Sequence, residues 1–374
     1  MKLSLSPSER QLQEEVREFL AAHAGSFSSL PRNLDERIGL LRDWQALCYE
    51  AGYVGRSWPA EFGGGGRATV EQMIVDQELA AAGAPEFVNV VGLDVLGPSL
   101  LTFGNNEQRS HHIPGILSAD EIWCQGFSEP DAGSDLASLR TRAVETDEHF
   151  VLSGQKTWVS WGHFARWCGV LARTDETVAR HRGISMLIVD MQSPGVEVRP
   201  ITQITGHAEF CEVFFDDVVV PKENLLGERG DGWKIAMHTV GHERGTAALP
   251  RQVKLRTWVD RAVREAADRE LLDDPATQHE LARALIGVEV LRHHAYRTVG
   301  EFLSGGAVGP ESSVVKLLMA EAEQRVAATA FDLLGDDEFW EETYLYSRAA
   351  SVYGGTQQIQ RSIIADRVLG LPKE

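Results

Sequence analysis

No stretch of this sequence is both long and apolar enough to span a bilayer, so nothing in it predicts a membrane protein. Cysteine is scarce: Cys48, Cys124, Cys168 and Cys211 include no CxxC pair and have no histidine at metal-ligand spacing. They predict reduced structural thiols and no metal site. The N-terminus lacks an apolar run and reaches Glu9 early, which argues against a secretory signal and predicts a cytoplasmic protein.

Positive charge is also in short supply. The chain has 36 Lys and Arg against 55 Asp and Glu, a formal net charge of -19, and its basic residues form no run of five. A phosphate backbone attracts basic patches, so this balance predicts no nucleic-acid partner, and solubility is its simplest explanation. At 374 residues the chain is too long for one simple core, which predicts two or three domains.

The first part of the chain, residues 1–121, predicts an all-α domain. Ser6 is a natural N-cap, Pro7 suits the first helical position, and Glu9 stands three residues after the cap, which together predict a helix from 6 to about 24. Apolar residues at helical spacing continue this pattern further along the chain. The additional predicted helices cover 35–51, 69–82 and 94–103.

The pattern changes to short β-rich runs in residues 122–231. Turn residues separate these runs, and no helical pattern lies between them. Parallel β-α-β crossovers are therefore disfavoured, and an antiparallel sandwich or barrel fits better. The predicted strands cover 150–153, 156–159, 168–172, 184–190, 196–199 and 213–220.

Residues 232–374 return to long helical patterns rich in Ala and Leu, which suit a four-helix bundle. Pro250 should end or kink the first helix of this part. The predicted fold class is therefore α+β, with an N-terminal all-α domain, a middle β-domain and a C-terminal helical bundle. The helices predicted in this last part cover 233–249, 253–269, 277–303, 310–334 and 357–368.

Four segments, in this order along the chain, resemble the signatures of acyl-CoA dehydrogenases. They are GFSEPDAGSD at 126–135, GQKTWVS at 154–160, VFFDDVVVP with the following ENLLG at 213–227, and VYGGTQQIQR at 352–361. The resemblance implies an α-β-α fold and FAD-dependent α,β-dehydrogenation of an acyl-CoA thioester. It further implies an electron-transfer flavoprotein as acceptor and a homodimer, homotetramer or heterotetramer.

The same resemblance implies which residues contact FAD. The Ser128 hydroxyl would lie near the ring edge, Trp158 would pack against the ring, and Ser160 would offer its hydroxyl towards N5. Ser134 would approach the pyrophosphate or the thioester, with Gly133 allowing close backbone approach. Plainer interpretations are a turn cap for Ser134 and a core position for Trp158. The implied cofactor contacts are Phe127, Ser128, Gly133, Ser134, Trp158, Ser160, Thr356 and Gln358.

The reaction needs a carboxylate base that removes the α-proton. Many family members carry it in the C-terminal signature, where this chain has Gly354, whose N–H could still bond the thioester carbonyl. A second branch of the family carries its Glu just before an Arg on the first C-terminal helix, the position of Glu243 and Arg244 here. Apolar residues share the predicted helix face of Glu243, which would desolvate the carboxylate and strengthen it as a base. Arg244 would contact substrate or hold the helix, and the alternative is a surface Glu–Arg pair.

Two segments depart from the family's common pattern. Residues 264–278 lack its Arg-x-x-Phe-Gly segment, and residues 334–340 lack its Gly-rich segment. Both losses resemble an actinobacterial sub-branch, some of whose members act on sterol side chains as two-gene heteromers. A non-catalytic or half-site partner subunit is therefore an alternative to the complete enzyme. A flavin monooxygenase on the same fold is a further alternative, and Glu243 argues against it.

Overall fold

The computed structural model describes residues 5–27, 29–246, 248–303 and 309–372, without the side chains of 242–246 and 302–303. Two compact units are present. Unit 1 comprises Met1–Ser29, Ala68–Pro85 and Glu243–Glu374, and unit 2 comprises Leu30–Arg67 and Glu86–His242. The domain boundaries expected after residues 121 and 231 stay a prediction.

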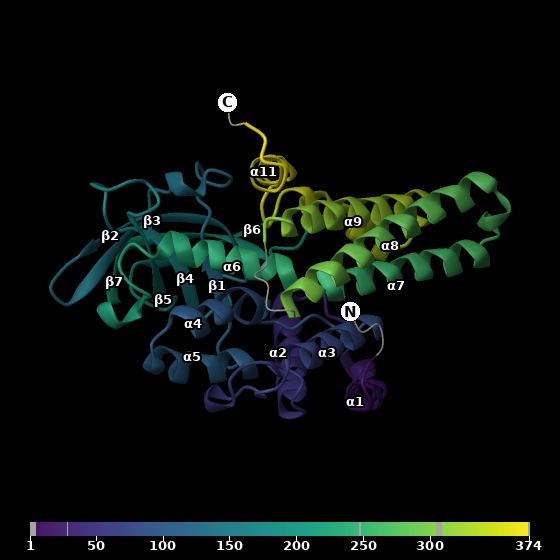
Figure 1. Cartoon of the computed structure of the whole chain (residues 1–374), viewed down its shortest axis with the longest axis horizontal. Coiled ribbons are helices and arrows are strands. Elements are labelled where there is room, and N and C mark those ends of the chain that lie inside the picture. The colour runs from purple at the N-terminus through teal and green to yellow at the C-terminus, as the bar shows by residue number, and fades with distance from the viewer. Residues whose placement is uncertain (1–4, 28, 247, 304–308, 373–374) are drawn as a thin grey trace. The chain divides into compact units, whose positions relative to one another are not determined.

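Unit 1 is helical. Helices α7, α8 and α9 run side by side (Figure 1), and their buried aliphatic side chains, among them Leu255, Leu291 and Val326, form one core with Met73 of α3. The helices are α1 (Pro7–His23), α3 (Thr69–Ala81), α7 (Ala248–Asp268), α8 (Pro275–Leu303), α9 (Ser312–Leu334), α10 (Glu338–Ser347) and α11 (Gln357–Ile363).

The predicted start of α1 is confirmed. Ser6 is the N-cap, and its hydroxyl accepts from the Glu9 N–H at 3.3 Å. The Glu9 carboxylate in turn accepts from the Ser6 N–H at 2.6 Å. This reciprocal pair satisfies two donors that the first helical turn leaves without helical partners.

Pro250 is the third residue of α7, and the helix before it is α6 (Gly232–Thr246). Residue 247, which lies between these two helices, is outside the described residues. The expected effect of Pro250 on the helix before it therefore stays a prediction.

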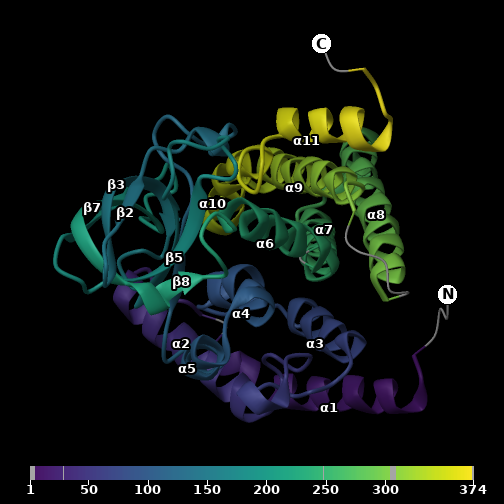
Figure 2. The same ribbon diagram turned by 60° about the vertical axis from the view of Figure 1, so that its left-hand side comes forward.

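Unit 2 is built around one eight-stranded sheet, seen in Figure 2, whose strands follow the order β6-β7-β3-β2-β4-β5-β8, with β1 paired to β4. Most neighbours are antiparallel, as expected, but β1 and β2 each pair with β4 in parallel, so the sheet is mixed. The strands are β1 (Trp123–Gly126), β2 (Arg142–Glu145), β3 (His149–Ser160), β4 (Trp167–Arg173), β5 (Ile184–Asp190), β6 (Val196–Ile201), β7 (Phe210–Pro221) and β8 (Leu225–Leu226).

The sheet supplies most of the core of unit 2. Its buried face gathers Phe150, Leu152, Val170, Leu187 and Val213, among others. The longer helices of this unit are α2 (Leu34–Glu50), the π-helix η3 (Val91–Leu96), α4 (Gly97–Phe103), α5 (Asn106–Ser118) and the part of α6 up to His242. Short helices elsewhere in the chain are η1 (Ala24–Phe27), η2 (Ala60–Phe62), η4 (Leu136–Ser138), η5 (Lys222–Asn224), η6 (Leu271–Asp273), η7 (Arg348–Ser351) and η8 (Ile364–Val368).

Helices α5 and α10 were not predicted from the apolar pattern. The buried positions of α5 include two polar residues, Gln108 and His112, which breaks the apolar periodicity. The available signal is the capping box, in which Asn105 accepts from the Gln108 N–H at 2.8 Å. Across the described residues, none of the helices has the length and apolarity of a bilayer span.

Candidate functional site

The loop after β1 is fastened to strand β3 through three consecutive residues. The main-chain N–H of Thr157 donates to the Ser128 carbonyl at 2.9 Å. The Lys156 ammonium donates to the Phe127 carbonyl at 3.1 Å and to Oε1 of Glu129 at 2.8 Å. The first two signature segments, far apart in the sequence, therefore contact one another directly.

The Glu129 carboxylate is buried and accepts from two further donors, the main-chain N–H groups of Arg140 at 2.7 Å and Thr141 at 2.9 Å. Burial alone would raise the pKa of Glu129, but Lys156 and these donors outweigh it, and the pKa is lowered. Burial lowers the pKa of Lys156 to about 8 against the opposing charge of Glu129. The opposite charges and the main-chain donors therefore offset part of the cost of burying this pair.

Strand β3 carries a bulge at Trp158. Lys156 pairs with Val213 and Val159 pairs with Cys211, so β3 contains one residue more than β7 across this interval. Trp158 adopts a left-handed φ of 59°, which is uncommon for a bulky side chain. Trp158 is 59% exposed. The interpretation of Trp158 as a core residue of the sheet is therefore wrong.

The other candidates from the first two signatures lie at the ends of these segments. Ser160 ends β3 and is half-buried, whereas Gly133 and Ser134 are exposed in the turn that follows the bridge between Glu129 and Ala132. A Cβ at position 133 would meet no atom within 4 Å, so the local fold does not itself require glycine there. That Gly133 leaves room for a ligand stays a prediction.

The C-terminal signature forms a turn that leads into α11. Gly354 and Gly355 have φ values of 62° and 94°, so the backbone favours glycine at both positions whatever their N–H groups bind. Thr356 is the N-cap of α11, and its hydroxyl accepts from the Ile359 N–H at 3.2 Å. Gln358 is exposed in the first turn of the helix. Their contact with the adenine side of FAD stays a prediction.

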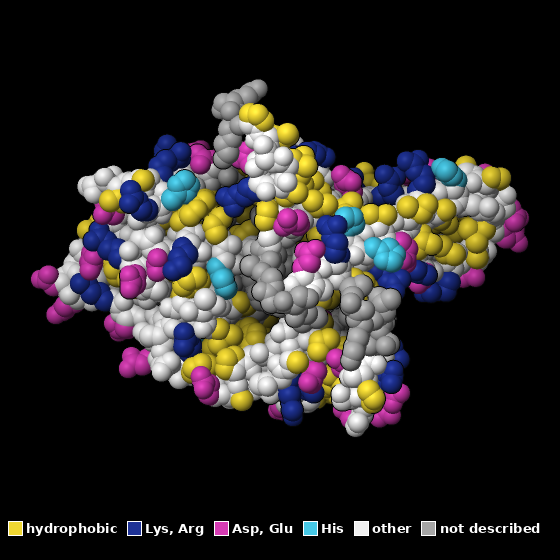
Figure 3. All heavy atoms as spheres, viewed as in Figure 1, with side chains coloured by type: hydrophobic (Ala, Val, Ile, Leu, Met, Phe, Trp, Pro, Cys, Tyr) yellow, Lys and Arg dark blue, Asp and Glu magenta, His cyan; other side chains and the backbone are white. Residues whose placement is uncertain are grey.

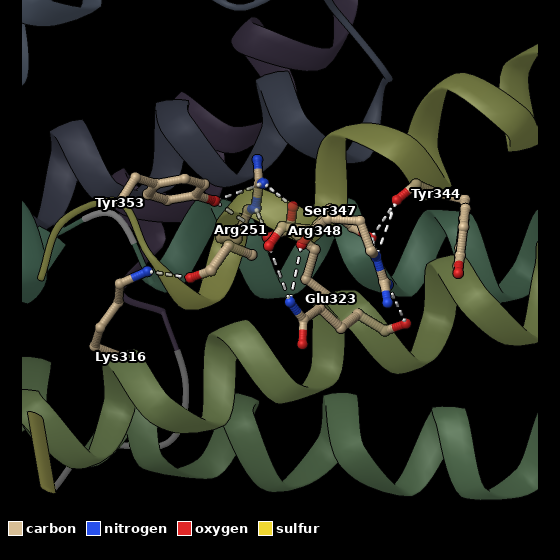
Figure 4. Close-up of polar contacts among 9 residues, drawn as sticks. Arg251, Lys316, Glu323, Tyr344, Ser347, Arg348 and Tyr353 are labelled. Atoms are coloured by element: carbon tan, nitrogen blue, oxygen red, sulfur yellow. Dashed lines mark hydrogen bonds and ion pairs between the residues drawn. The ribbon is translucent and has the colours of Figure 1, made fainter. Parts of the chain in front are cut away.

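A buried ionic network anchors this turn to α7 and α9 (Figure 4). Arg251 Nη2 lies 2.6 Å from Glu323 Oε1, and the Tyr353 hydroxyl lies 3.5 Å from atoms of both residues. Lys316 donates to the Ala350 carbonyl at 2.9 Å, and its ammonium stands 4.3 Å from the centre of the Tyr353 ring. The position of Tyr353 is therefore determined by charged groups on two helices.

The short helix η7, just before the signature, is fixed by the same face of α9. Gln324 Nε2 donates to the Ser347 carbonyl at 3.1 Å and to the Ser351 hydroxyl at 3.2 Å. Arg348 donates in turn to the Gln324 carbonyl at 3.3 Å, and Figure 4 shows Ser347 and Arg348 beside Glu323 of α9. Apart from Tyr353, which stands in the C-terminal signature, the members of this network were not predicted from the sequence, because they are ordinary polar residues spread over separate segments.

Glu243 and Arg244 belong to the last turns of α6, but their side chains lie outside the described residues. Their roles therefore stay predictions.

Three sequence models of one family match the chain end to end: "Acyl-CoA dehydrogenase, N-terminal domain" over residues 6–120, "middle domain" over 124–218 and "C-terminal domain" over 230–369. The chain belongs to the acyl-CoA dehydrogenase family. It is thus an enzyme of a family of flavoprotein oxidoreductases, and the fold class expected from the four signatures is confirmed.

Acyl-CoA dehydrogenases with similar sequences include "Acyl-CoA dehydrogenase IpdE1" of Mycobacterium tuberculosis, which is 40% identical and aligns over 97% of this chain and 98% of its own length. Among solved structures, the "Tcur3481-Tcur3483 steroid ACAD" has a TM-score of 0.88 at 28% identity, with 100% of each chain covered. The "ChsE4-ChsE5 complex from Mycobacterium tuberculosis" has a TM-score of 0.86 at 29% identity, also with 100% of each chain covered.

The two segments that depart from the common acyl-CoA dehydrogenase pattern contact one another in unit 1. Arg269 pairs with Asp336, and the Trp340 indole donates to Glu265 at 2.7 Å. The Arg261 guanidinium, one turn before Glu265, lies 4.0 Å from the centre of the Phe339 ring. Residues 264–278 and 334–340 are therefore joined within the chain by charge and aromatic contacts.

One group of side chains among the described residues has metal-ligand character. The ligand atoms of His111, His112 and Glu121 lie within 4.8 Å of one another, and His112 Nδ1 is 3.4 Å from Glu121 Oε2. His112 also packs edge-on against Trp123 and Trp167, with ring centroids 4.9 and 4.8 Å apart. This packing and the pairing with Glu121 account for the buried histidine without an ion.

Lys156 and Glu129, which hold the two signature segments together, were not predicted from the sequence. Both stand inside the signatures, beside the hydroxyl and aromatic side chains that the resemblance assigns to the flavin. The available signal was Lys156 itself, a lysine at the start of the strand predicted over 156–159. A lysine in such a place needs an acid partner, because a buried charge without one is strongly unfavourable.

Proposed function

We propose that this acyl-CoA dehydrogenase catalyses FAD-dependent α,β-dehydrogenation of an acyl-CoA thioester. The observation that carries the proposal is the bulge of β3 held against the Phe127–Ser128 loop. It presents an exposed tryptophan with a left-handed φ, and the residue before it, Thr157, is hydrogen-bonded to the Ser128 carbonyl. A planar, polar-edged ring system fits such a platform, because one face needs an apolar wall and the edge needs donors.

Residues of the first two signatures and of the C-terminal signature would contact FAD. Trp158 would cover the ring, Phe127 and Ser128 would meet its edge, and Ser160 would offer a hydroxyl towards N5. Gly133 and Ser134 would approach the pyrophosphate, the latter alternatively the thioester. Bound FAD would supply the acceptor for the hydride that leaves the β-carbon. The residues proposed for the adenine side are Thr356 and Gln358.

Proton removal would fall to Glu243. Its carboxylate would take the α-proton, while the Gly354 N–H would donate to the thioester carbonyl and stabilise the negative charge that develops there. Arg244 would contact the substrate or hold the helix. The positive φ of Gly354 supports this division of roles, since that backbone conformation favours glycine over a glutamate base at the same position.

The test is to purify the chain, record its visible spectrum and titrate it with a panel of acyl-CoAs of different length and branching. Bleaching of the flavin band by one of them, lost in Glu243→Gln with the bound flavin retained, would support the proposal. An intact flavin band that no acyl-CoA bleaches would contradict it. Electron-transfer flavoprotein is the acceptor to supply for turnover.

A second candidate is a chain that shares its flavin site with a related subunit. The contacts between residues 264–278 and 334–340 favour it, because groups engaged within one chain are not available to a neighbour's cofactor. Figure 3 shows apolar side chains gathered over the part of the bundle formed by α7 and α8. Exposed apolar residues there are Val263, Ile286, Val290 and Tyr296. Such a surface suits a second dehydrogenase chain.

The stoichiometry of bound flavin separates the two candidates. The chain is expressed alone and together with candidate partner dehydrogenase chains, and flavin per polypeptide is measured after gel filtration. One flavin per chain in a homo-oligomer supports the complete enzyme. A colourless chain that acquires flavin only in a mixed oligomer supports the shared site.

A further inference from the structure

Lys156 is the most completely buried charged side chain of the β-sheet region, with no exposed surface. Its ammonium has two acceptors, Glu129 Oε1 at 2.8 Å and the Phe127 carbonyl at 3.1 Å. A well-packed apolar pair of similar volume would often stabilise a fold as well as a buried ion pair does. What an apolar pair cannot provide is a directional bond to a chosen carbonyl.

The bond to Phe127 determines which way the next N–H points. In a planar trans peptide the C=O and N–H vectors are opposed. Because the Phe127 carbonyl is directed at the buried ammonium, the Ser128 N–H is directed away from it. Within the described part of the chain, that N–H has no hydrogen-bond partner. It is a main-chain donor left free by the fold.

The neighbouring contacts prevent this peptide from rotating. The Ser128 carbonyl accepts from the Thr157 N–H at 2.9 Å, and Glu129 exchanges main-chain hydrogen bonds with Ala132, each 3.1 Å long. The Glu129 carboxylate is itself held by two main-chain N–H groups of the segment that leads into β2. Lys156 therefore connects a rigid loop to the strand that, two residues later, presents Trp158.

We propose that Lys156, paired with Glu129, is a positioning residue for the flavin: it orients the Phe127–Ser128 peptide so that the Ser128 N–H donates to the edge of the ring that Trp158 covers. This inference rests on the proposed FAD-dependent function. The ammonium also polarises the amide whose carbonyl it binds, which strengthens the N–H as a donor. A stronger donor at the ring edge favours the electron-rich, reduced flavin.

The experiment compares Lys156→Met, which keeps the length of the side chain but not its charge, with the wild type. Lys222→Met is the matched control, since Lys222 forms a partly exposed pair with Glu145 at 3.0 Å. Three quantities are measured for each folded protein: the melting temperature, the Kd of the apo-protein for FAD, and the reduction potential of the bound flavin. If the wild type binds no FAD, either alone or with a partner chain, the result counts against the proposed function and not against the role of Lys156.

The expected result for Lys156→Met is FAD affinity weaker by about tenfold, the loss of roughly one good hydrogen bond, together with a lower flavin potential. Lys156→Arg should restore part of the potential, and Lys222→Met should match the wild type. If Lys156→Met does not fold, Lys156→Gln, which keeps a donor but no charge, is judged by the same measurements. A folded, uncharged variant at position 156 with wild-type FAD affinity and potential would overturn the proposal.

Discussion

Lys156 Nζ lies 2.8 Å from Glu129 Oε1, and this ion pair between a strand and a loop is closed off from solvent on the lysine side. Removing one member of such a pair leaves the other charge buried without compensation. We expect Glu129→Gln to lower the free energy of unfolding by roughly 3–5 kcal/mol. Urea unfolding followed by circular dichroism measures the change.

Glu145→Gln is the control for that prediction. Glu145 pairs with Lys222 at 3.0 Å where both side chains are more than a third exposed, so we expect a change of only about 0–1 kcal/mol. Equal effects of the two substitutions would show that burial does not distinguish the pairs.

Replacement of Glu243 by Gln should remove the proposed base without disturbing the flavin. We expect kcat to fall by about 10²–10⁴-fold, the usual contribution of general base catalysis, with an unchanged flavin spectrum. Stopped-flow reduction by the best acyl-CoA measures the step directly. Glu228→Gln, an exposed residue in the turn before α6, should reduce flavin at the wild-type rate.

We expect the backbone conformation of Trp158 to lower the stability of the fold, and its side chain to strengthen FAD binding. Its left-handed backbone is uncomfortable for any residue with a Cβ, so Trp158→Gly should be more stable than Trp158→Ala by about 1 kcal/mol. Both variants should bind FAD more weakly than the wild type, because the wall of the ring is gone. Thermal melts and FAD titrations of the two variants give both quantities, and a less stable glycine variant would contradict the argument from strain.

We expect replacement of Asp76 in α3 to stabilise the fold in a pH-dependent way. Burial raises the pKa of Asp76 to about 6, although the Gln72 side chain donates to it at 2.8 Å. A carboxyl whose pKa is higher in the folded state stabilises the fold below its unfolded pKa and loses that contribution as the pH rises through about 6. Asp76→Asn should therefore be more stable than the wild type near pH 7.5, and the difference should vanish near pH 4.

Melting curves across this pH range test the Asp76 prediction. Asp332→Asn, an exposed aspartate of α9, should leave the pH profile unchanged. A stabilisation by Asp76→Asn that is the same at every pH would contradict the assigned pKa.

Local sequence signals predicted the elements that local physics determines. The start of α1 followed from Ser6 and Glu9, and the main strands followed from β-rich runs between turns. The feature of the fold that was not predicted depends on a non-local contact. The parallel pairing of β1 with β4 is invisible in the sequence, because no crossover helix separates these strands along the chain.

The candidate site divides in the same way. Phe127, Ser128 and Trp158 became candidates because they stand in the signatures. Glu323 and Arg251 did not, since a glutamate in the middle of α9 and an arginine in α7 resemble solvated helix positions until the structure pairs them at 2.6 Å. Pairs formed by residues far apart in sequence leave no local pattern behind them.

The discontinuous composition of unit 1 determines the order in which the protein can fold on the ribosome. Unit 2 is complete once His242 has emerged, whereas α3 packs its Met73 into a core whose other members, from α7 to α9, are synthesised later. Helices α1 and α3 therefore lack their main packing partners during most of translation, and their apolar surface is exposed to chaperones or to aggregation. A nascent chain truncated after His242 should accordingly hold a folded sheet and a protease-sensitive α1 and α3.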